Sequence, residues 1–244
     1  MLCERCKKRD SIAVVGGRKL CVLCARDEII KRIKREFYPN KVLVYREHIL
    51  FAYPIYLSQI SDLLKMILLD KIYKKFSLSY SELPIDPTNS IIDDIWSIII
   101  KSKIFSKQNN INKVILPFTA DFLMAYLIYS ISKGDYTYIN LLDFEYKLDN
   151  ILFLIPFYNT SIIELQGFIN ANELNLITKD ELFNTIIKWE TELLKDNYEL
   201  FHAFHNSKKL FQEKNYKCEG CGGLINSPVK YCERCSVAFA SHPY

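Results

Sequence analysis

Eight cysteines are the residues of this sequence whose type and spacing point most directly to chemistry. They form two groups, each built from two Cys-x-x-Cys pairs: Cys3, Cys6, Cys21 and Cys24, the N-terminal quartet, and Cys218, Cys221, Cys232 and Cys235, the C-terminal quartet. A Cys-x-x-Cys pair presents two thiolates at one tight turn, and two facing pairs supply the four ligands of a tetrahedral structural zinc site. The spacing therefore predicts two four-cysteine zinc ribbons whose metal is structural, because four thiolates leave no position open for water. Iron in place of zinc stays open.

Four disulfides would use the same number of cysteines, but dense disulfide frameworks are typical of small secreted domains. This chain has 244 residues and shows no signal-peptide pattern. Its longest uncharged runs have 14 residues and are interrupted by Pro54 and Pro156, whereas a membrane span needs about 20 apolar residues. We expect a cytoplasmic protein with reduced thiols and no membrane contact.

Positive charge is concentrated near the N-terminus. Residues 1–42 contain twelve Lys and Arg against five Asp and Glu, which gives this segment a net charge of +7. The whole chain has a net charge of only +4. This distribution indicates a polyanion partner, most commonly a nucleic acid, or simply a solvated basic helix face. The candidate nucleic-acid-binding residues are Arg18, Lys19, Arg26, Lys31, Arg32, Lys34 and Arg35.

The elements that must position these groups alternate between short apolar runs and amphipathic segments. Such alternation predicts an α/β fold, with a parallel sheet covered by helices. The expected strands are 41–45, 48–53, 76–80, 113–116 and 151–155, and the expected helices are 26–37, 57–75, 90–103, 121–132, 161–171, 180–195 and 198–214. Thr178 and Glu181 have the spacing of a capping box at the start of one of these helices.

The corresponding domain organisation is a compact body between two small ribbons. We predict an N-terminal ribbon at 1–25, a basic linker helix at 26–40, an α/β domain at 41–214, a C-terminal ribbon at 215–237 and a loose tail at 238–244.

The body also contains a run that resembles a known family. Residues 113–122 read KVILPFTADF, and a helix-like segment then leads to Ser-Lys-Gly-Asp at 132–135. This layout is similar to the strand, T-G-H-N-A-D-D, helix and L-R-G-D of the tRNA 2-thiouridine synthetases, which are PP-loop ATP pyrophosphatases. The ribbon, body and ribbon arrangement resembles that family from end to end. The resemblance implies a Rossmann-like PP-loop domain of the adenine nucleotide alpha hydrolase type, with helices on both faces.

The chain departs from the family where the family does its chemistry. The family's S-G-G-K-D-S loop follows the first core strand, but here residues 54–59 read PIYLSQ, without glycine or lysine. Backbone N–H groups of glycines and a lysine charge are what such a loop uses to hold phosphate. Asp121 is kept from the second motif, and we interpret it as a favourable charge at a helix N-terminus rather than as a catalytic group. We expect no ATP site, and no iron–sulfur cluster because the body contains no cysteine.

Taken with these losses, the resemblance is to the non-catalytic subunit of the cytoplasmic tRNA 2-thiolation heterodimer. It implies a pseudoenzyme that supports wobble-uridine 2-thiolation, helps to bind tRNA, and pairs with an active PP-loop tRNA sulfurtransferase paralogue. Two alternatives remain open: a zinc-ribbon nucleic-acid-binding adaptor unrelated to thiolation, and an enzyme with a relocated nucleotide site.

Overall fold

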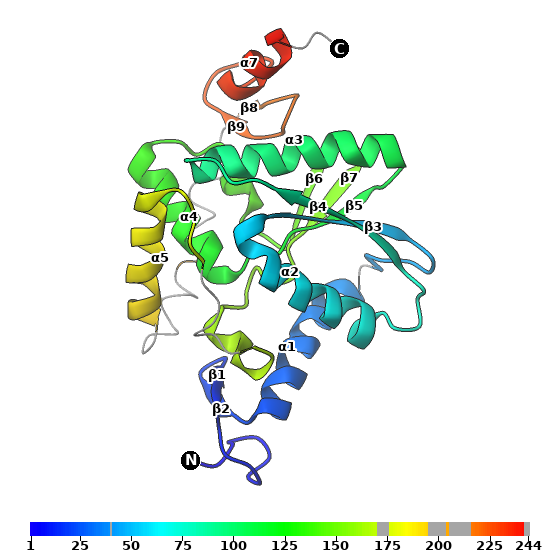
Figure 1. Cartoon of the computed structure of the whole chain (residues 1–244), viewed down its shortest axis with the longest axis vertical. Helices are drawn as coiled ribbons and strands as arrows, with labels where there is room; N and C mark the ends of the chain where they lie inside the picture. Colours follow the sequence, from blue (N-terminus) through cyan, green and yellow to red (C-terminus); the bar gives the residue numbers. More distant parts are fainter. Residues whose placement is uncertain (40, 170–175, 195–203, 205–215, 242–244) are drawn as a thin grey trace.

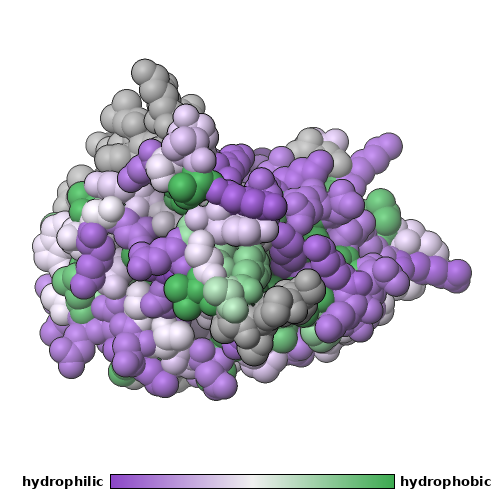
Figure 2. All heavy atoms as spheres, turned by 90° about the horizontal axis from the view of Figure 1, so that it is seen from above, coloured by the Kyte–Doolittle hydropathy of each residue, from purple (hydrophilic) through white to green (hydrophobic). Residues whose placement is uncertain are grey.

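A central sheet with helices on both faces separates two small ribbons in this protein (Figure 1). The structure is a computed structural model, and it describes residues 1–39, 41–169, 176–194, 204 and 216–241. The N-terminal ribbon lies at one end of the long axis and the C-terminal ribbon at the other, which is the end seen from above in Figure 2. This arrangement confirms the α/β fold class and the terminal position of both cysteine quartets.

Five strands form the central sheet. In spatial order they are β4 (Ser79–Ile85), β3 (His48–Pro54), β5 (Lys113–Ile115), β7 (Ile151–Leu154) and β6 (Glu145–Leu148). The first four are parallel, and β6 pairs antiparallel with β7. Residues 49–52 of β3 have no exposed surface, since a parallel strand covered on both faces is read as a continuous apolar run.

Helices cover the two faces of the sheet unequally. The helices are α1 (Val22–Phe37), α2 (Ser58–Lys65), α3 (Ile91–Asn109), α4 (Ala120–Lys133), α5 (Glu181–Leu194) and α7 (Glu233–Ser241). Figure 1 shows α3 on one face and α1 and α2 on the other. Helix α4 is buried along most of its length because α5 packs on its outer side. Among the described residues, none of the helices combines the length and apolarity that a bilayer span requires.

The two ribbons each contain one short hairpin. Strands β1 (Ala13–Val15) and β2 (Arg18–Leu20) pair in the first, and β8 (Tyr216–Lys217) and β9 (Leu224–Ile225) pair in the second. Gly16 and Gly17 have φ of +58° and +74°, so the β1–β2 turn needs the left-handed backbone that glycine adopts without strain. The turn predicted at this dipeptide is confirmed.

Two predicted strands near the start of the sheet are wrong. Residues 41–45 form turns rather than a strand, with Lys41 in the left-handed region at φ +45°. The strand predicted at 76–80 lies instead at Ser79–Ile85. Pro84 is accommodated in this strand because β4 lies at the edge of the sheet, where a residue without an N–H group is tolerated.

Other boundaries also differ from the predictions. Helix α1 begins four residues earlier than expected, and the helix expected at 57–75 ends as a π-helix at Met66–Ile72. The helix predicted at 161–171 is a 3-10 helix at Ile163–Gly167, and the predicted tail is partly wrong because α7 continues to Ser241. The helix predicted at 198–214 lies outside the described residues, apart from position 204, which is helical.

The capping box predicted before α5 is replaced by a different cap. Asp180 Oδ1 accepts a hydrogen bond from the Phe183 N–H at 3.1 Å, and Thr178 Oγ1 accepts one from the Asp180 N–H at 3.1 Å. Asp180 is therefore the N-cap residue. The α4 cap is simpler, because Thr119 Oγ1 accepts from the Phe122 N–H at 3.4 Å.

Candidate metal centres and the carboxyl end of the sheet

The N-terminal quartet gathers its four thiols at the outer end of α1. Their sulfur atoms lie within 4.8 Å of one another. Cys3 and Cys21 are buried, but Cys6 and Cys24 are only half-buried. A hydrogen bond from the Cys24 backbone lowers the pKa of Cys21, which favours the thiolate that binds metal. Because Cys24 lies inside α1, the ribbon and the helix share one rigid element.

The C-terminal quartet is buried at all four positions. Its sulfur atoms also lie within 4.8 Å of one another. The Cys232 N–H donates to Cys218 Sγ at 3.2 Å, and hydrogen bonds from the Cys221, Cys232 and Cys235 thiols lower the pKa of Cys218. The two quartets thus share a ligand set and differ in exposure.

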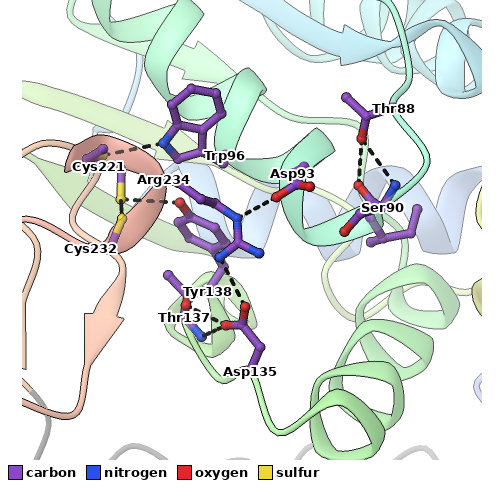
Figure 3. A network of polar contacts seen from close by, with 12 residues as sticks. Thr88, Ser90, Asp93, Trp96, Asp135, Thr137, Tyr138, Cys221, Cys232 and Arg234 are labelled. Atoms are coloured by element: carbon purple, nitrogen blue, oxygen red, sulfur yellow. Dashed lines mark hydrogen bonds and ion pairs between the residues drawn. The ribbon is translucent and has the colours of Figure 1, made fainter. Parts of the chain in front are cut away.

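Side chains of the body donate hydrogen bonds to the sulfur atoms of the C-terminal quartet (Figure 3). Trp96 of α3 donates its Nε1–H to Cys235 Sγ at 3.4 Å, and Tyr138 donates its O–H to Cys221 Sγ at 3.2 Å. Four thiolates around a divalent metal carry a net charge of −2, and donors of this kind spread that charge and orient the ligands. No sequence motif indicated either donor.

Arg234 ties the same ribbon to two carboxylates of the body. Its Nε lies 2.5 Å from Asp93 Oδ1 on α3, and its Nη1 lies 3.0 Å from Asp135 Oδ2 (Figure 3). Backbone contacts add to this link, since the Leu224 N–H donates to the Thr137 oxygen at 2.6 Å. A Cβ on Gly222 would lie 1.8 Å from the Tyr146 hydroxyl oxygen, so ribbon and body approach too closely there for any other residue.

The spacing of the thiols fits a single tetrahedral metal ion. Cys6 and Cys21 have an Sγ–Sγ distance of 3.8 Å, and so do Cys221 and Cys232. Zinc–sulfur bonds of about 2.3 Å at tetrahedral angles place sulfur atoms about 3.8 Å apart, whereas a disulfide requires about 2.05 Å. The residues therefore fit a metal site with four cysteine ligands at each end of the chain.

The chain has neither glycine nor lysine in the turn that follows β3. It passes through a 3-10 turn at Ile55–Leu57 into α2, and no glycine occurs between Gly17 and Gly134. Tyr56 turns toward α3 and donates its hydroxyl to Asp94 Oδ2 at 3.2 Å. In the described structure this turn is thus packed against α3 rather than built as an open cradle of N–H groups.

Asp121 makes a structural contact at the start of α4. Its carboxyl is buried, and Oδ2 accepts from the Ile162 N–H at 2.5 Å, which joins α4 to the 161–167 segment. Burial and the nearby Glu164 raise the pKa of Asp121 to about 7. The backbone contact favours the structural interpretation of this residue over a catalytic one.

Glu190 is a buried acid that sequence reasoning missed. Its side chain on α5 is fully buried, and neither carboxyl oxygen has a hydrogen-bond partner among the described residues. Burial, with a smaller effect from the charge of Asp121, raises the pKa of Glu190 to about 10. The group is therefore protonated at neutral pH. Its position three and seven residues after the apolar Ile187 and Phe183 was the one available signal.

The predicted nucleic-acid-binding residues divide into two sets. Arg32 is nearly buried and forms a two-pronged ion pair with Glu164, with Nη1–Oε2 and Nη2–Oε1 distances of 2.8 and 3.0 Å. Arg26 donates to the Gly167 oxygen and lies over the Phe168 ring. Arg32 is thus used inside the protein, and Arg26, although exposed, is engaged with the body. The others lie on the outer face of β2 and α1 and are Arg18, Lys19, Lys31, Lys34 and Arg35.

The outer five still differ in their surroundings. Lys31 pairs with Asp27 at 3.0 Å, and Arg18 and Arg35 pair with Glu28 at 3.2 and 3.5 Å. These pairs are at the surface, where an ion pair contributes about 0–1 kcal/mol. A phosphate can therefore compete for the cations at little cost.

Comparison with known proteins supplies a structural match without a sequence match. No protein-family model matches the chain, and no curated protein matches it by sequence. The solved structures include a similar one, described as the U34-tRNA thiolase NcsA from Methanococcus maripaludis with its [4Fe-4S] cluster. The two superimpose with a TM-score of 0.67 over 98% of this chain and 96% of that chain, at 14% sequence identity. The chain therefore shares the overall fold of that structure.

The match with the thiolase is one of architecture. It spans both ribbons and the sheet, so the fold implied by the sequence resemblance is confirmed over nearly the whole length. All eight cysteines of this chain belong to the two quartets, and the body between them contains none.

Proposed function

We propose that this chain is a non-catalytic, accessory subunit in the 2-thiolation of the wobble uridine of tRNA. It would act beside an active PP-loop tRNA sulfurtransferase and help to bind tRNA. The observation that carries this proposal is a thiolase fold over 98% of the chain, combined with a β3–α2 turn that has neither glycine nor lysine.

The chemistry of thiolation explains why that turn matters. Activation of the uridine oxygen by ATP requires donors for phosphate, and sulfur transfer requires a cysteine or an iron–sulfur cluster near the reacting base. Pro54 removes one backbone donor, and Tyr56 is bonded to α3. The quartets supply thiolates only at structural metal sites. An active subunit would therefore have to contribute both steps.

In the proposed role, the metals stabilise the ribbons rather than take part in the reaction. We assign zinc to both quartets, because four thiolates at tetrahedral spacing match its usual structural site. A ribbon of about 25 residues has too little apolar core to fold without the metal. The exposed cations of β2 and α1 would provide the first contact with tRNA phosphates.

A pull-down from the cells that make this protein tests the proposal. The full chain is captured and the bound proteins are identified. An intact PP-loop synthetase at near-equal stoichiometry is expected, and 2-thiouridine formed by that synthetase should fall when this chain is withheld. Recovery of the chain without such a synthetase, or full thiolation in its absence, would show that the role is wrong.

A zinc-ribbon nucleic-acid-binding adaptor unrelated to thiolation remains the second candidate, because the basic face of α1 could bind nucleic acid in a protein with no role in thiolation. An adaptor would bind RNA or DNA of unrelated sequence with similar affinity and recover no sulfurtransferase. ATP binding by the isolated chain would instead favour an enzyme with a relocated nucleotide site, and equilibrium dialysis with labelled ATP would detect it.

A further inference from the structure

A second basic surface lies at the amino end of the sheet, on the side opposite the carboxyl ends of the strands. It is formed where the chain enters the parallel strands β3 and β4, from the end of α1, the 41–47 turns and the end of the π-helix. Its exposed side chains, which we call the amino-edge surface, are Tyr38, Lys41, Tyr45, Arg46, Lys71, Lys74 and Lys75.

Direct contacts hold these segments together. The Arg46 N–H donates to the Phe76 oxygen at 2.8 Å, and the Ser79 N–H donates to the Glu47 oxygen at 3.1 Å. The Tyr38 hydroxyl donates to the Ile72 oxygen at 3.3 Å. Residues that are 30 or more positions apart in sequence therefore present one continuous surface.

The charge of this surface is not balanced by nearby acids. None of the cations at 41, 46, 71, 74 and 75 forms an ion pair with a described residue. Glu47 is nearly buried and paired with Lys113 Nζ at 2.9 Å, which leaves Asp70 as the exposed acid beside the lysines. Such an excess of positive charge fits a polyanion.

Exposed aromatic rings stand among the cations. Tyr45 is 58% exposed and Tyr38 is 46% exposed. The Arg46 guanidinium lies 5.1 Å from the centroid of the Tyr45 ring, and Lys34 Nζ lies 5.8 Å from that of Tyr38. Rings held in this way offer flat faces on which unpaired bases stack, while the cations meet the phosphates.

Backbone strain is concentrated at the same surface. Lys41, Arg46 and Ser77 have φ of +45°, +59° and +50°, although none is glycine. Left-handed residues with long side chains are unfavourable and tend to persist where function requires a particular presentation. Two of the three are cations of this surface.

We propose that the amino-edge surface binds a single-stranded segment of RNA, with its lysines on phosphates and Tyr45 stacked on a base. This inference rests on the proposed role in tRNA binding and adds a second contact to it. Helix α1, whose 16 residues span about 24 Å, joins the N-terminal ribbon to this surface. Its last turn carries the half-buried Lys34 and the exposed Arg35, which continue the positive charge between the two.

The test compares two triple variants of the full chain that remove the same charge. Lys71→Ala/Lys74→Ala/Lys75→Ala acts on the amino-edge surface. Lys133→Ala/Lys179→Ala/Lys188→Ala removes exposed lysines of α4, of α5 and of the segment just before α5, and both helices lie away from α2 in Figure 1. An unmodified tRNA transcript with uridine at position 34 is the probe, and binding is titrated from about 0.05 to 0.5 M salt.

The amino-edge triple should lose about two units of the slope of log K against log salt, since each single-strand phosphate contact contributes about 0.7. Its affinity at about 0.1 M salt should fall about ten- to a hundredfold, while the control triple stays within about twofold of wild type. Equal losses in both triples would overturn the proposal, because they would reflect net charge alone.

A separate pair of variants tests the stacking. Tyr45→Ala should weaken binding of oligouridylate about tenfold and leave binding of a blunt RNA duplex unchanged, whereas Tyr45→Phe keeps the ring and should bind as wild type. Equal behaviour of the Ala and Phe variants would contradict a stacked base.

Failure of this inference can be distinguished from failure of the proposed function. If wild type binds tRNA, and charge removal at Lys31, Lys34 and Arg35 weakens it while the amino-edge triple does not, the second contact is wrong and tRNA binding stands. If wild type binds no tRNA, both fail. If the amino-edge triple binds tRNA normally but no longer recovers the sulfurtransferase, this surface is a protein interface and the RNA proposal is wrong.

Discussion

The ion pair between Arg32 and Glu164 should dominate the stability of the N-terminal half of this protein. The side chains are 14% and 3% exposed, respectively. Glu164 Oε1 also accepts from the Gly16 N–H at 2.8 Å, and Oε2 accepts from the Ser161 N–H at 3.0 Å. One carboxylate thus joins the ribbon hairpin, α1 and the body. We predict that Arg32→Met, which keeps most of the apolar stem, destabilises the fold strongly.

The magnitude follows from the charge that remains. Removing one partner of a buried pair leaves the other without compensation, which typically costs about 3–5 kcal/mol. Two backbone N–H groups still donate to Glu164 in the variant, so we expect the lower end, about 3 kcal/mol, or a roughly hundredfold change in the unfolding equilibrium. Arg35→Met is the matched control, because Arg35 is 68% exposed and its loss should cost less than about 1 kcal/mol.

Urea unfolding at fixed zinc concentration measures both variants. Adding Glu164→Gln to Arg32→Met should recover part of the loss, since the amide carries no charge and its one oxygen can still accept one of the two backbone hydrogen bonds. Below the unfolding transition, Arg32→Met should bind tRNA nearly as wild type does. An Arg32→Met protein that unfolds at the wild-type urea concentration yet loses tRNA affinity would refute this reasoning and return Arg32 to the RNA-binding surface.

Burial of the Glu190 carboxyl should make stability depend on pH. The pKa of Glu190 is raised to about 10, so its contribution to the free energy of unfolding is complete below about pH 4.5. As pH rises, this contribution falls by up to about 1.4 kcal/mol per pH unit between about pH 5 and 8. Glu190→Gln should flatten the pH dependence of the urea midpoint, and an unchanged dependence would contradict the prediction. The N-terminal quartet should lose its metal to a chelator before the C-terminal quartet, because two of its thiols are half-buried. Metal analysis of the Cys3→Ser and Cys218→Ser proteins, each of which leaves the other quartet intact, would measure the two rates of loss separately. Indistinguishable rates would argue against a role for burial. Tyr138→Phe removes the hydrogen bond to Cys221 Sγ and should weaken metal binding at the C-terminal quartet about tenfold in competition with a chelator, while equal metal affinity would mean that the hydroxyl does not support the site.

Local patterns in the sequence predicted much of the fold. Continuous apolar runs identified β3, β5 and β7, and the cysteine spacing identified both quartets. The strand β6 was missed although its four residues alternate between charged and apolar and a two-residue turn at Asp149 and Asn150 leads to its partner. Strand pairing at an edge depends on the neighbouring strand more than on local propensity.

The candidate sites were harder to predict than the elements. The metal ligands are local in sequence, so their spacing was sufficient. The groups that support them are not, since Arg234 and Asp93 are 141 residues apart and Trp96 and Cys235 are 139 apart. Arg32 was misjudged for the same reason. Its place in a basic helix suggested a phosphate contact, but its actual partner is Glu164, 132 residues away in the sequence.

The docking of the last ribbon also sets an order of events during synthesis. The Tyr138 hydroxyl cannot form its hydrogen bond until Cys221, 83 residues later, has been synthesised, and the Trp96 indole needs Cys235 in the same way. At about 5–20 residues per second, the ribosome needs roughly 7–28 seconds to close the longer of these gaps. Throughout that interval these polar groups depend on water. These contacts between the body and the last ribbon can therefore form only after Cys235 has been added to the chain.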